Sequence, residues 1–352
     1  MDTVTQATLG AAVGEMVLGK KIGNKAPLWG AVLGIVPDLD VLTIPFVSNM
    51  QALAIHRGIT HSIVFCVAAA ILLGWMLDRL YRKESVGWRN WSWMAFWTLS
   101  THVFIDVCTS YGTQILQPFS NRLFSLDTIF IVDPFYTLPL VIGILIALFI
   151  RRESTARRWA NYAGIAVSSL YLLAGLAVKS HVNAVFERNF EAETITPEQY
   201  ITTPTPFNIF LWTGYGEQGD TLYAGLYSLF DDEDDIRFHR IAQNEKLLEP
   251  YRGQPAVDRL LWFSRGYFVA DKGANGELFV HDLRFGRSDF WLTGQPAPYV
   301  WNYQLQFNKD STRVTGFRHF QPDFERRAAL LGQLMDRIFT GRTGLHQPHS
   351  SR

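Results

Sequence analysis

The long apolar stretches of the chain constrain its fold more than any other feature. A helix that crosses a lipid bilayer needs about 20 mostly apolar residues, within a range of about 17–25. Trp159–Val178 meets this length, and so does Thr137–Ile150 when the residues from Ile129 onward lead into it. The mean hydropathy of the whole chain is only +0.05, because nearly all long apolar runs lie in residues 1–180. We therefore predict a membrane domain over residues 1–180.

Four further segments are shorter or carry polar residues. Together with the two long stretches they predict about six spanning helices, because each is still mostly apolar over nearly the required length. These four segments are Val4–Leu18, Pro27–Val47, Ser62–Leu80 and Trp91–Thr109.

Basic residues gather in alternate connections between the predicted helices. Cytoplasmic loops of membrane proteins are enriched in Lys and Arg. The other connections are poor in them, with Arg57 in one and Arg122 in the next. We therefore expect the N-terminus and the region after the sixth helix to face outward. The basic connections contain Lys20, Lys21 and Lys25, then Arg79, Arg82, Lys83 and Arg89, then Arg151, Arg152, Arg157 and Arg158.

Residues 181–352 have a different character. Residues 181–199 read as a polar helix or linker, and short aromatic runs with turn signals follow. The tract DKGANG predicts a hairpin turn, and Phe324–Thr340 predicts a closing amphipathic helix. The predicted fold is thus an all-α transmembrane bundle over residues 1–180, followed by a soluble, extracytoplasmic α+β domain with an antiparallel sheet over residues 181–352. In that domain Arg284 and Arg287 could face an anionic headgroup, although lone arginines usually pair with carboxylates.

The predicted membrane half contains ionisable residues inside or beside its apolar segments. A charged side chain at the centre of a spanning helix costs roughly 2.5–3.5 kcal/mol on insertion scales, so such residues usually have a partner or a function. Here they fall in three short motifs, PDLD, HRGITHS and STHVFIDV. The motif residues are Asp38, Asp40, His56, His61, His102 and Asp106.

Spacing and topology bring the three motifs together. His102 and Asp106 are four residues apart and so share one face of a helix. Pro37 disturbs the helix that carries PDLD, and Gly58 favours a turn within HRGITHS. In the predicted topology all three motifs lie at the outward-facing end of the bundle. Imidazole and carboxylate are standard ligands of zinc, iron and manganese, so the motifs predict a metal site.

Such a site would support hydrolysis. A bound ion lowers the pKa of water towards about 7 and polarises a carbonyl or phosphoryl oxygen, and an uncoordinated carboxylate can act as general base. Three alternatives stay open. The same residues could form a hydrogen-bonded core, or an ion- or proton-coupled transport path, although the chain lacks the paired broken helices of inverted-repeat transporters. The helices could also be a non-catalytic membrane anchor. With 32 basic and 32 acidic residues, net charge gives no reason to expect a nucleic-acid partner.

The order of the motifs resembles a known family. PDLD, then HRGITHS, then TH-x3-D followed by TSYGT is similar to the YdjM/YbcI-like family of membrane-bound metal-dependent hydrolases. The opening DTVTQATLGAAVGE and the segment KKIGNKAPLWGAVLG look like one branch of it, and the resemblance covers about residues 1–180. It implies a bacterial inner-membrane, multi-pass protein with a divalent metal, zinc first and manganese or iron as alternatives. The ligands that it implies are Asp38, Asp40, His56, His61, His102 and Asp106.

The resemblance also sharpens the expected activity. It implies a membrane-bound metal-dependent hydrolase whose substrate is a membrane lipid or a lipid-linked or membrane-proximal ester. A looser similarity to zinc-dependent phospholipase C and P1 nuclease-like proteins favours a phosphoester. The catalytic candidates are Asp38, His61 and Asp106. Many members carry a histidine near the N-terminus where this chain has Gln6, so Glu15 is a substitute candidate for a ligand from the first helix.

Overall fold

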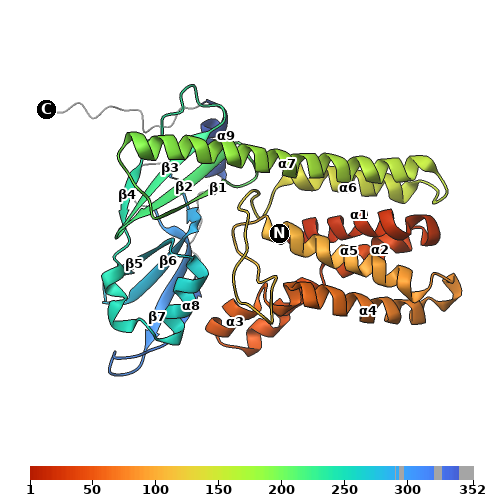
Figure 1. Cartoon of the computed structure of the whole chain (residues 1–352), viewed down its shortest axis with the longest axis horizontal. Coiled ribbons are helices and arrows are strands. Elements are labelled where there is room, and N and C mark those ends of the chain that lie inside the picture. The colour runs from red at the N-terminus through yellow and green to blue at the C-terminus, as the bar shows by residue number, and fades with distance from the viewer. Residues whose placement is uncertain (290, 293–296, 321–326, 341–352) are drawn as a thin grey trace. The chain divides into compact units, whose positions relative to one another are not determined.

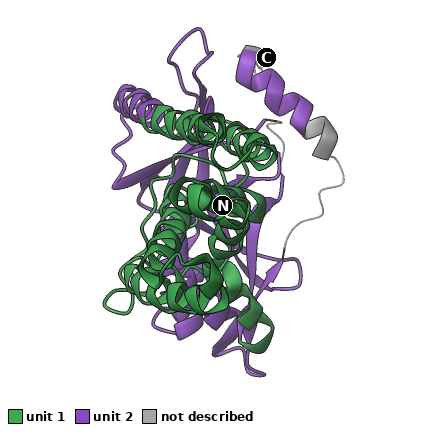
Figure 2. Cartoon of the chain, turned by 90° about the vertical axis from the view of Figure 1, so that its right-hand side faces the viewer, with its two compact units in different colours: residues 1–47, 54–176, 206–208 green, residues 48–53, 177–205, 209–352 purple. Residues whose placement is uncertain are grey.

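The chain forms two compact units. The computed structural model describes residues 1–289, 291–292, 297–320 and 327–340. The first unit contains residues 1–47, 54–176 and 206–208, and the second contains residues 48–53, 177–205 and 209–352 (Figure 2). Helix α7 belongs to both, because its 38 residues run from Thr155 to Ala192.

The first unit is helical. Its α-helices are α1 (Thr3–Ile22), α2 (Lys25–Gly34), α4 (Ile63–Leu80), α5 (Trp88–Val107), α6 (Pro134–Phe149) and the first part of α7 (Figure 1). The residues of the short helix α3 (Asn49–Ile55) are divided between the two units. The 3₁₀ helices of this unit are η1 (Pro37–Phe46), η2 (Ile59–His61) and η3 (Arg82–Glu84).

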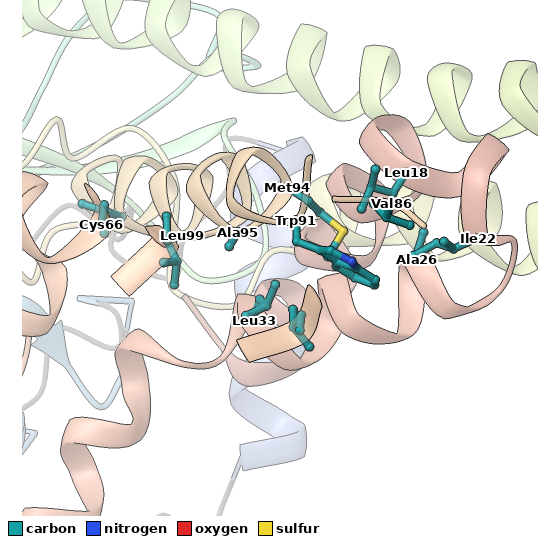
Figure 3. Packing of buried hydrophobic residues seen from close by; sticks show 13 residues of the cluster. Leu18, Ile22, Ala26, Leu33, Cys66, Val86, Trp91, Met94, Ala95 and Leu99 are labelled. Carbon is teal, nitrogen blue, oxygen red and sulfur yellow. The ribbon is translucent and has the colours of Figure 1, made fainter. Parts of the chain in front are cut away.

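Helix α5 packs in the middle of one core cluster of this unit. Trp91, Met94 and Leu99 of α5 belong to one buried cluster with Leu18 of α1 and Leu33 of α2 (Figure 3). All five side chains are almost completely buried. Between membrane helices such contacts stabilise the fold through close van der Waals packing. Helix α5 therefore has a fixed place in the unit, which matters because its C-terminal half carries two of the motif residues.

Helices α1 and α2 form an unusually close pair. Gly10 and Gly14 on α1 face Gly30 and Gly34 on α2, so each helix presents a small residue at a spacing of four. A Cβ atom added to Gly10 would lie 2.3 Å from the carbonyl oxygen of Gly30. Small residues at this spacing let helix backbones touch, as they commonly do in membrane proteins. This contact sets the position of Gly34 at the end of α2.

Two or three segments of the helical region are candidate membrane spans. Helices α4 and α7 are each long and apolar enough to cross a bilayer, and α6 is apolar but shorter. Helix α2 and η1 meet the criterion together, with a bend of 43° between them. The segment predicted over Pro27–Val47 is thus two helices with a bend between them, and the disturbance expected at Pro37 is confirmed. Pro37 explains the break, because proline has no amide hydrogen and its ring clashes with the preceding turn.

The second unit contains two antiparallel sheets. The first has the order β1 (Gln199–Pro204), β2 (Leu211–Gln218), β3 (Thr221–Ser228), β4 (His239–Ala242). The second has the order β5 (Phe268–Lys272), β6 (Leu278–Arg287), β7 (Tyr299–Phe307), β8 (Val314–Phe320). This confirms the predicted antiparallel-sheet domain, and the DKGANG tract connects β5 to β6 as expected. Its remaining helices are α8 (Pro255–Ser264), α9 (Arg327–Thr340), η4 (Glu245–Leu247) and η5 (Glu249–Tyr251).

The structure decides between the alternatives left open for two features of the second unit. The polar segment after residue 180 is the end of α7, where Phe186 and Phe190 pack in one core cluster with Trp212 of β2. Arg284 and Arg287 do not face outward as headgroup ligands, because their guanidinium groups pair with the carboxylates of neighbouring aspartates in the same chain. The predicted helix Phe324–Thr340 corresponds to α9, and residues 324–326 lie outside the described part of the chain.

Candidate metal centre

Four side chains from three segments of the first unit point at one place. Asp38 comes from η1, His61 from η2, and His102 and Asp106 from α5. One ligand atom from each of the four lies within 4.8 Å of the others. The side chains of His61, His102 and Asp106 are at most 1 % exposed, whereas that of Asp38 is 22 % exposed. The group is therefore buried on three sides, with Asp38 as its accessible member.

The distances between these four ligand atoms match those expected for tetrahedral coordination of a metal ion. His61 Nε2 lies 3.2 Å from His102 Nε2, 3.3 Å from Asp38 Oδ1 and 3.2 Å from Asp106 Oδ2. His102 Nε2 lies 3.6 Å from Asp38 Oδ1 and 3.5 Å from Asp106 Oδ2. Ligands bonded tetrahedrally at 2.0–2.1 Å to zinc would be about 3.3–3.4 Å apart. Five of the six edges of such a tetrahedron thus have nearly the ideal length.

A backbone carbonyl fixes the His102 ring. The Nδ1 atom lies 2.6 Å from the carbonyl oxygen of Gly34 at the end of α2. A carbonyl can only accept a hydrogen bond, so Nδ1 carries the proton and donates it. In a neutral ring the other nitrogen then has a free lone pair, and Nε2 presents it to the cluster. Hydrogen bonds of this kind set the tautomer and orientation of histidines that bind metals.

Asp40 and Thr60 orient His61 in the same way. The Thr60 hydroxyl donates to Asp40 Oδ2 over 3.1 Å, so its oxygen is free to accept from His61 Nδ1 at 3.0 Å. Asp40 also accepts from the Arg57 amide at 3.0 Å and lies 3.0 Å from His56 Nδ1. These contacts occupy both carboxylate oxygens of Asp40. They leave the Nε2 lone pair of His61 turned toward His102.

His56 and Asp40 belong to a second, overlapping group. One ligand atom each of Asp38, Asp40 and His56 lies within 4.8 Å of the others. The structure thus brings all six motif residues into two groups that share Asp38. The His56 side chain is 24 % exposed and its bond to Asp40 uses one ring nitrogen. In this geometry Asp40 and His56 support the four-residue group from outside.

The two oxygens of Asp106 have different surroundings. Oδ1 contacts the Gln6 amide at 3.0 Å, Arg57 Nη2 at 3.2 Å and the amino group of Met1. Oδ2 is buried and accepts no hydrogen bond among the described residues, yet it faces both histidine Nε2 atoms. A buried polar atom without a partner costs roughly 1–3 kcal/mol. With two imidazole lone pairs aimed at the same place, the donor set fits a divalent cation.

Three residues have other places than the sequence indicated. Glu15 is not in the cluster: its carboxylate forms a buried ion pair with Arg157, at 2.6 Å from each of two guanidinium nitrogens. Gln6 reaches the cluster but turns its amide nitrogen to Asp106, so it acts as a donor instead of a ligand. Arg57 was counted as a loop charge, yet it is buried and also donates to Thr109 Oγ1 over 2.8 Å. Its position between His56 and His61 in the HRGITHS motif was the sequence signal that could have identified it.

Fold and site together define a class of protein: a helical membrane protein with a buried Asp/His cluster able to hold a metal ion. The chain belongs to the YdjM inner membrane protein family, whose model matches residues 1–182. This confirms the resemblance in the sequence motifs and places the chain among inner membrane proteins.

Two curated relatives each match half of the chain or less. The uncharacterized protein YfhP of Bacillus subtilis (strain 168) is 28 % identical over an alignment of 182 residues that covers 49 % of this chain and 51 % of YfhP. The inner membrane protein YbcI of Escherichia coli (strain K12) is 29 % identical over an alignment of 143 residues that covers 39 % of this chain and 81 % of YbcI. The chain thus covers about half the length of YfhP. No solved structure matches it significantly.

Proposed function

We propose that the chain is a membrane-bound metal-dependent hydrolase that cleaves an ester, with a phosphoester as the preferred type. The ion would be held by Asp38, His61, His102 and Asp106, with zinc as the expected metal and manganese or iron as alternatives. One observation carries the proposal: two imidazole nitrogens and two carboxylate oxygens face one buried point at tetrahedral spacing. A divalent ion at such a point supplies Lewis-acid polarisation of an ester oxygen and lowers the pKa of water.

Side chains in and around the cluster would have distinct roles in the reaction. Asp38 is the most exposed of the four residues, so water and substrate would approach the site from its side. Asp38 would hold the ion through Oδ1, and its second carboxylate oxygen would accept a proton from the attacking water. Arg57 and Gln6 hold Asp106 through Oδ1 and thereby keep Oδ2 turned to the histidines. Hydrolysis would form a bond between the water oxygen and the acyl or phosphoryl centre and break the bond from that centre to the leaving oxygen, which takes up the proton.

An activity assay tests this proposal. The full chain, purified in detergent and loaded with zinc, manganese or iron, is given bis-p-nitrophenyl phosphate and p-nitrophenyl butyrate. We expect hydrolysis of at least one substrate, and a loss of about 10²–10⁴ in kcat for Asp38→Asn, which is typical of a lost general base. Asp78→Asn, outside the cluster, is the control. A metal-loaded protein that cleaves neither ester contradicts the proposal. Ion flux in proteoliposomes that Asp106→Asn abolishes would favour a transporter. Unchanged function in all variants of the cluster would favour a non-catalytic membrane anchor.

We further propose that about six helices cross the bacterial inner membrane, with the basic connections in the cytoplasm and the C-terminal domain outside. The charge asymmetry of the connections supports this orientation. Arg82 and Arg122 are both exposed, so they are a matched pair of positions for a labelling cysteine. Cys66 and Cys108 are both buried, so the native cysteines should add little background labelling. In intact spheroplasts, an impermeant maleimide should label Arg122→Cys, whereas it should label Arg82→Cys only after permeabilisation. The reverse pattern would invert the orientation.

A further inference from the structure

The segment that supplies Asp38 is also strongly apolar on its exposed side. Within the ten residues of η1, five large apolar side chains are at least 36 % exposed, and Phe46 reaches 87 %. Side chains three residues apart eclipse one another in a 3₁₀ helix, so Val41 and Ile44 lie in the row that begins at Asp38. The five side chains are Leu39, Val41, Leu42, Ile44 and Phe46.

Apolar side chains also flank His61 on the neighbouring element. η1 and η2 are in contact. Ile59 at the start of η2 and Ile63 at the start of α4 are 44 % and 56 % exposed, and each is two residues from His61. The accessible edge of a buried, polar metal centre is therefore bordered by exposed apolar side chains on both contacting segments.

Part of this border belongs to a candidate membrane span. Helix α2 and η1 meet the criterion for a membrane span only as a pair, so the exposed side chains of η1 belong to a segment with the apolar character of a span. A substrate dissolved in water would gain nothing from an apolar border. A molecule with an anionic, oxygen-rich head and apolar chains matches both the metal site and its apolar border. A divalent ion held by carboxylates and imidazoles binds phosphoryl oxygens, and the apolar side chains would contact the apolar chains.

We infer that η1 is the access route of a membrane phospholipid, which places its phosphate beside Asp38 and its acyl chains along Val41 and Ile44. The inference rests on the proposed function, since it names the substrate class of the same metal centre. It also assigns η1 a task beyond carrying ligands: the 43° bend after α2 turns an apolar face outward next to Asp38.

Photolabelling tests the inference without requiring turnover. The full, zinc-loaded chain is reconstituted in vesicles with an ether-linked phosphatidic acid that carries a diazirine in one chain, and labelled peptides are mapped by mass spectrometry. We expect residues 39–46 to be labelled several-fold more than Ile71 and Leu72, which are exposed on α4. The excess should disappear with a diazirine diacylglycerol that lacks the phosphate, after chelation of zinc, and in His102→Ala.

A pair of double variants completes the test. Val41→Ser with Ile44→Ser should lower the labelling of η1 about tenfold, as expected when two large apolar contacts are lost, whereas Ile71→Ser with Leu72→Ser should leave it unchanged. Equal labelling of η1 and α4 by both probes would mean contact with bulk lipid only, and would overturn the inference. Phosphate-dependent labelling of η1 without any ester hydrolysis would refute the proposed hydrolase while the lipid site stands. Hydrolysis without such labelling would refute the lipid site alone.

Discussion

Replacing His61 by alanine is expected to abolish metal binding, whereas the same change at His56 is expected to leave the metal in place. Nε2 of His61 lies 3.2–3.3 Å from ligand atoms of all three other residues, so its loss removes one corner of the tetrahedron. Affinity should fall by more than about 100-fold, the upper limit for losing a supporting residue outside the ligand shell. His56 contacts Asp40 instead, and its replacement should weaken binding by about tenfold.

Elemental analysis of the purified variants, after dialysis against a chelator of graded strength, measures the difference. The wild type should retain about one ion per chain. The His56→Ala variant should also retain its ion against the weaker chelators, whereas the His61→Ala variant should retain none. Equal loss in both variants would mean that the ion lies between the two groups, near Asp38 and Asp40. A wild-type chain without stoichiometric metal under every loading condition would refute the metal centre.

Replacing Arg157 by methionine is expected to destabilise the chain by about 3–5 kcal/mol, the usual effect of removing one partner of a buried ion pair. Both side chains of the Arg157–Glu15 pair are 2 % exposed, and Arg157 also donates to Asn24 Oδ1 over 2.7 Å. The variant leaves the Glu15 carboxylate buried and uncompensated. Unfolding in mixed micelles, followed by the loss of helical circular dichroism, gives the change in free energy.

Two controls separate this effect from a general sensitivity to lost charge. Glu15→Gln combined with Arg157→Met removes both charges and should recover most of the lost stability. Arg188→Met breaks the exposed pair between Arg188 and Asp234, whose side chains are about half exposed, and should change stability by less than about 1 kcal/mol. Equal effects of Arg157→Met and Arg188→Met would mean that the buried pair has no special role.

The grouping of the six motif residues could be predicted from sequence because two independent patterns agreed. Helical spacing placed His102 and Asp106 on one face, and the charge of the connections placed PDLD and HRGITHS at the same end of the bundle. The division of roles within the group was not predictable. Whether Asp40 binds an ion or orients His61 depends on the Thr60 hydroxyl, whose direction only the folded turn determines.

The errors have a common physical origin in contacts between distant segments. Glu15 and Arg157 are 142 residues apart, so nothing near Glu15 identifies its partner, and a lone carboxylate in an apolar helix resembles a ligand. The same holds for the C-terminal domain. Local turn chemistry predicted the hairpin between β5 and β6, but the division into two four-stranded sheets depends on pairings that no single segment specifies.

The close contact of α1 with α2 has a consequence for how the protein matures. Gly34 is both a small residue of that contact and the carbonyl that holds His102. The ring can therefore turn its lone pair toward His61 only once the first two helices have docked against each other and against α5. Binding to a site that exists only in the folded state adds its free energy to folding. The ion would therefore stabilise the docked arrangement of α1, α2 and α5. Its occupancy would report how many chains in the membrane have finished folding.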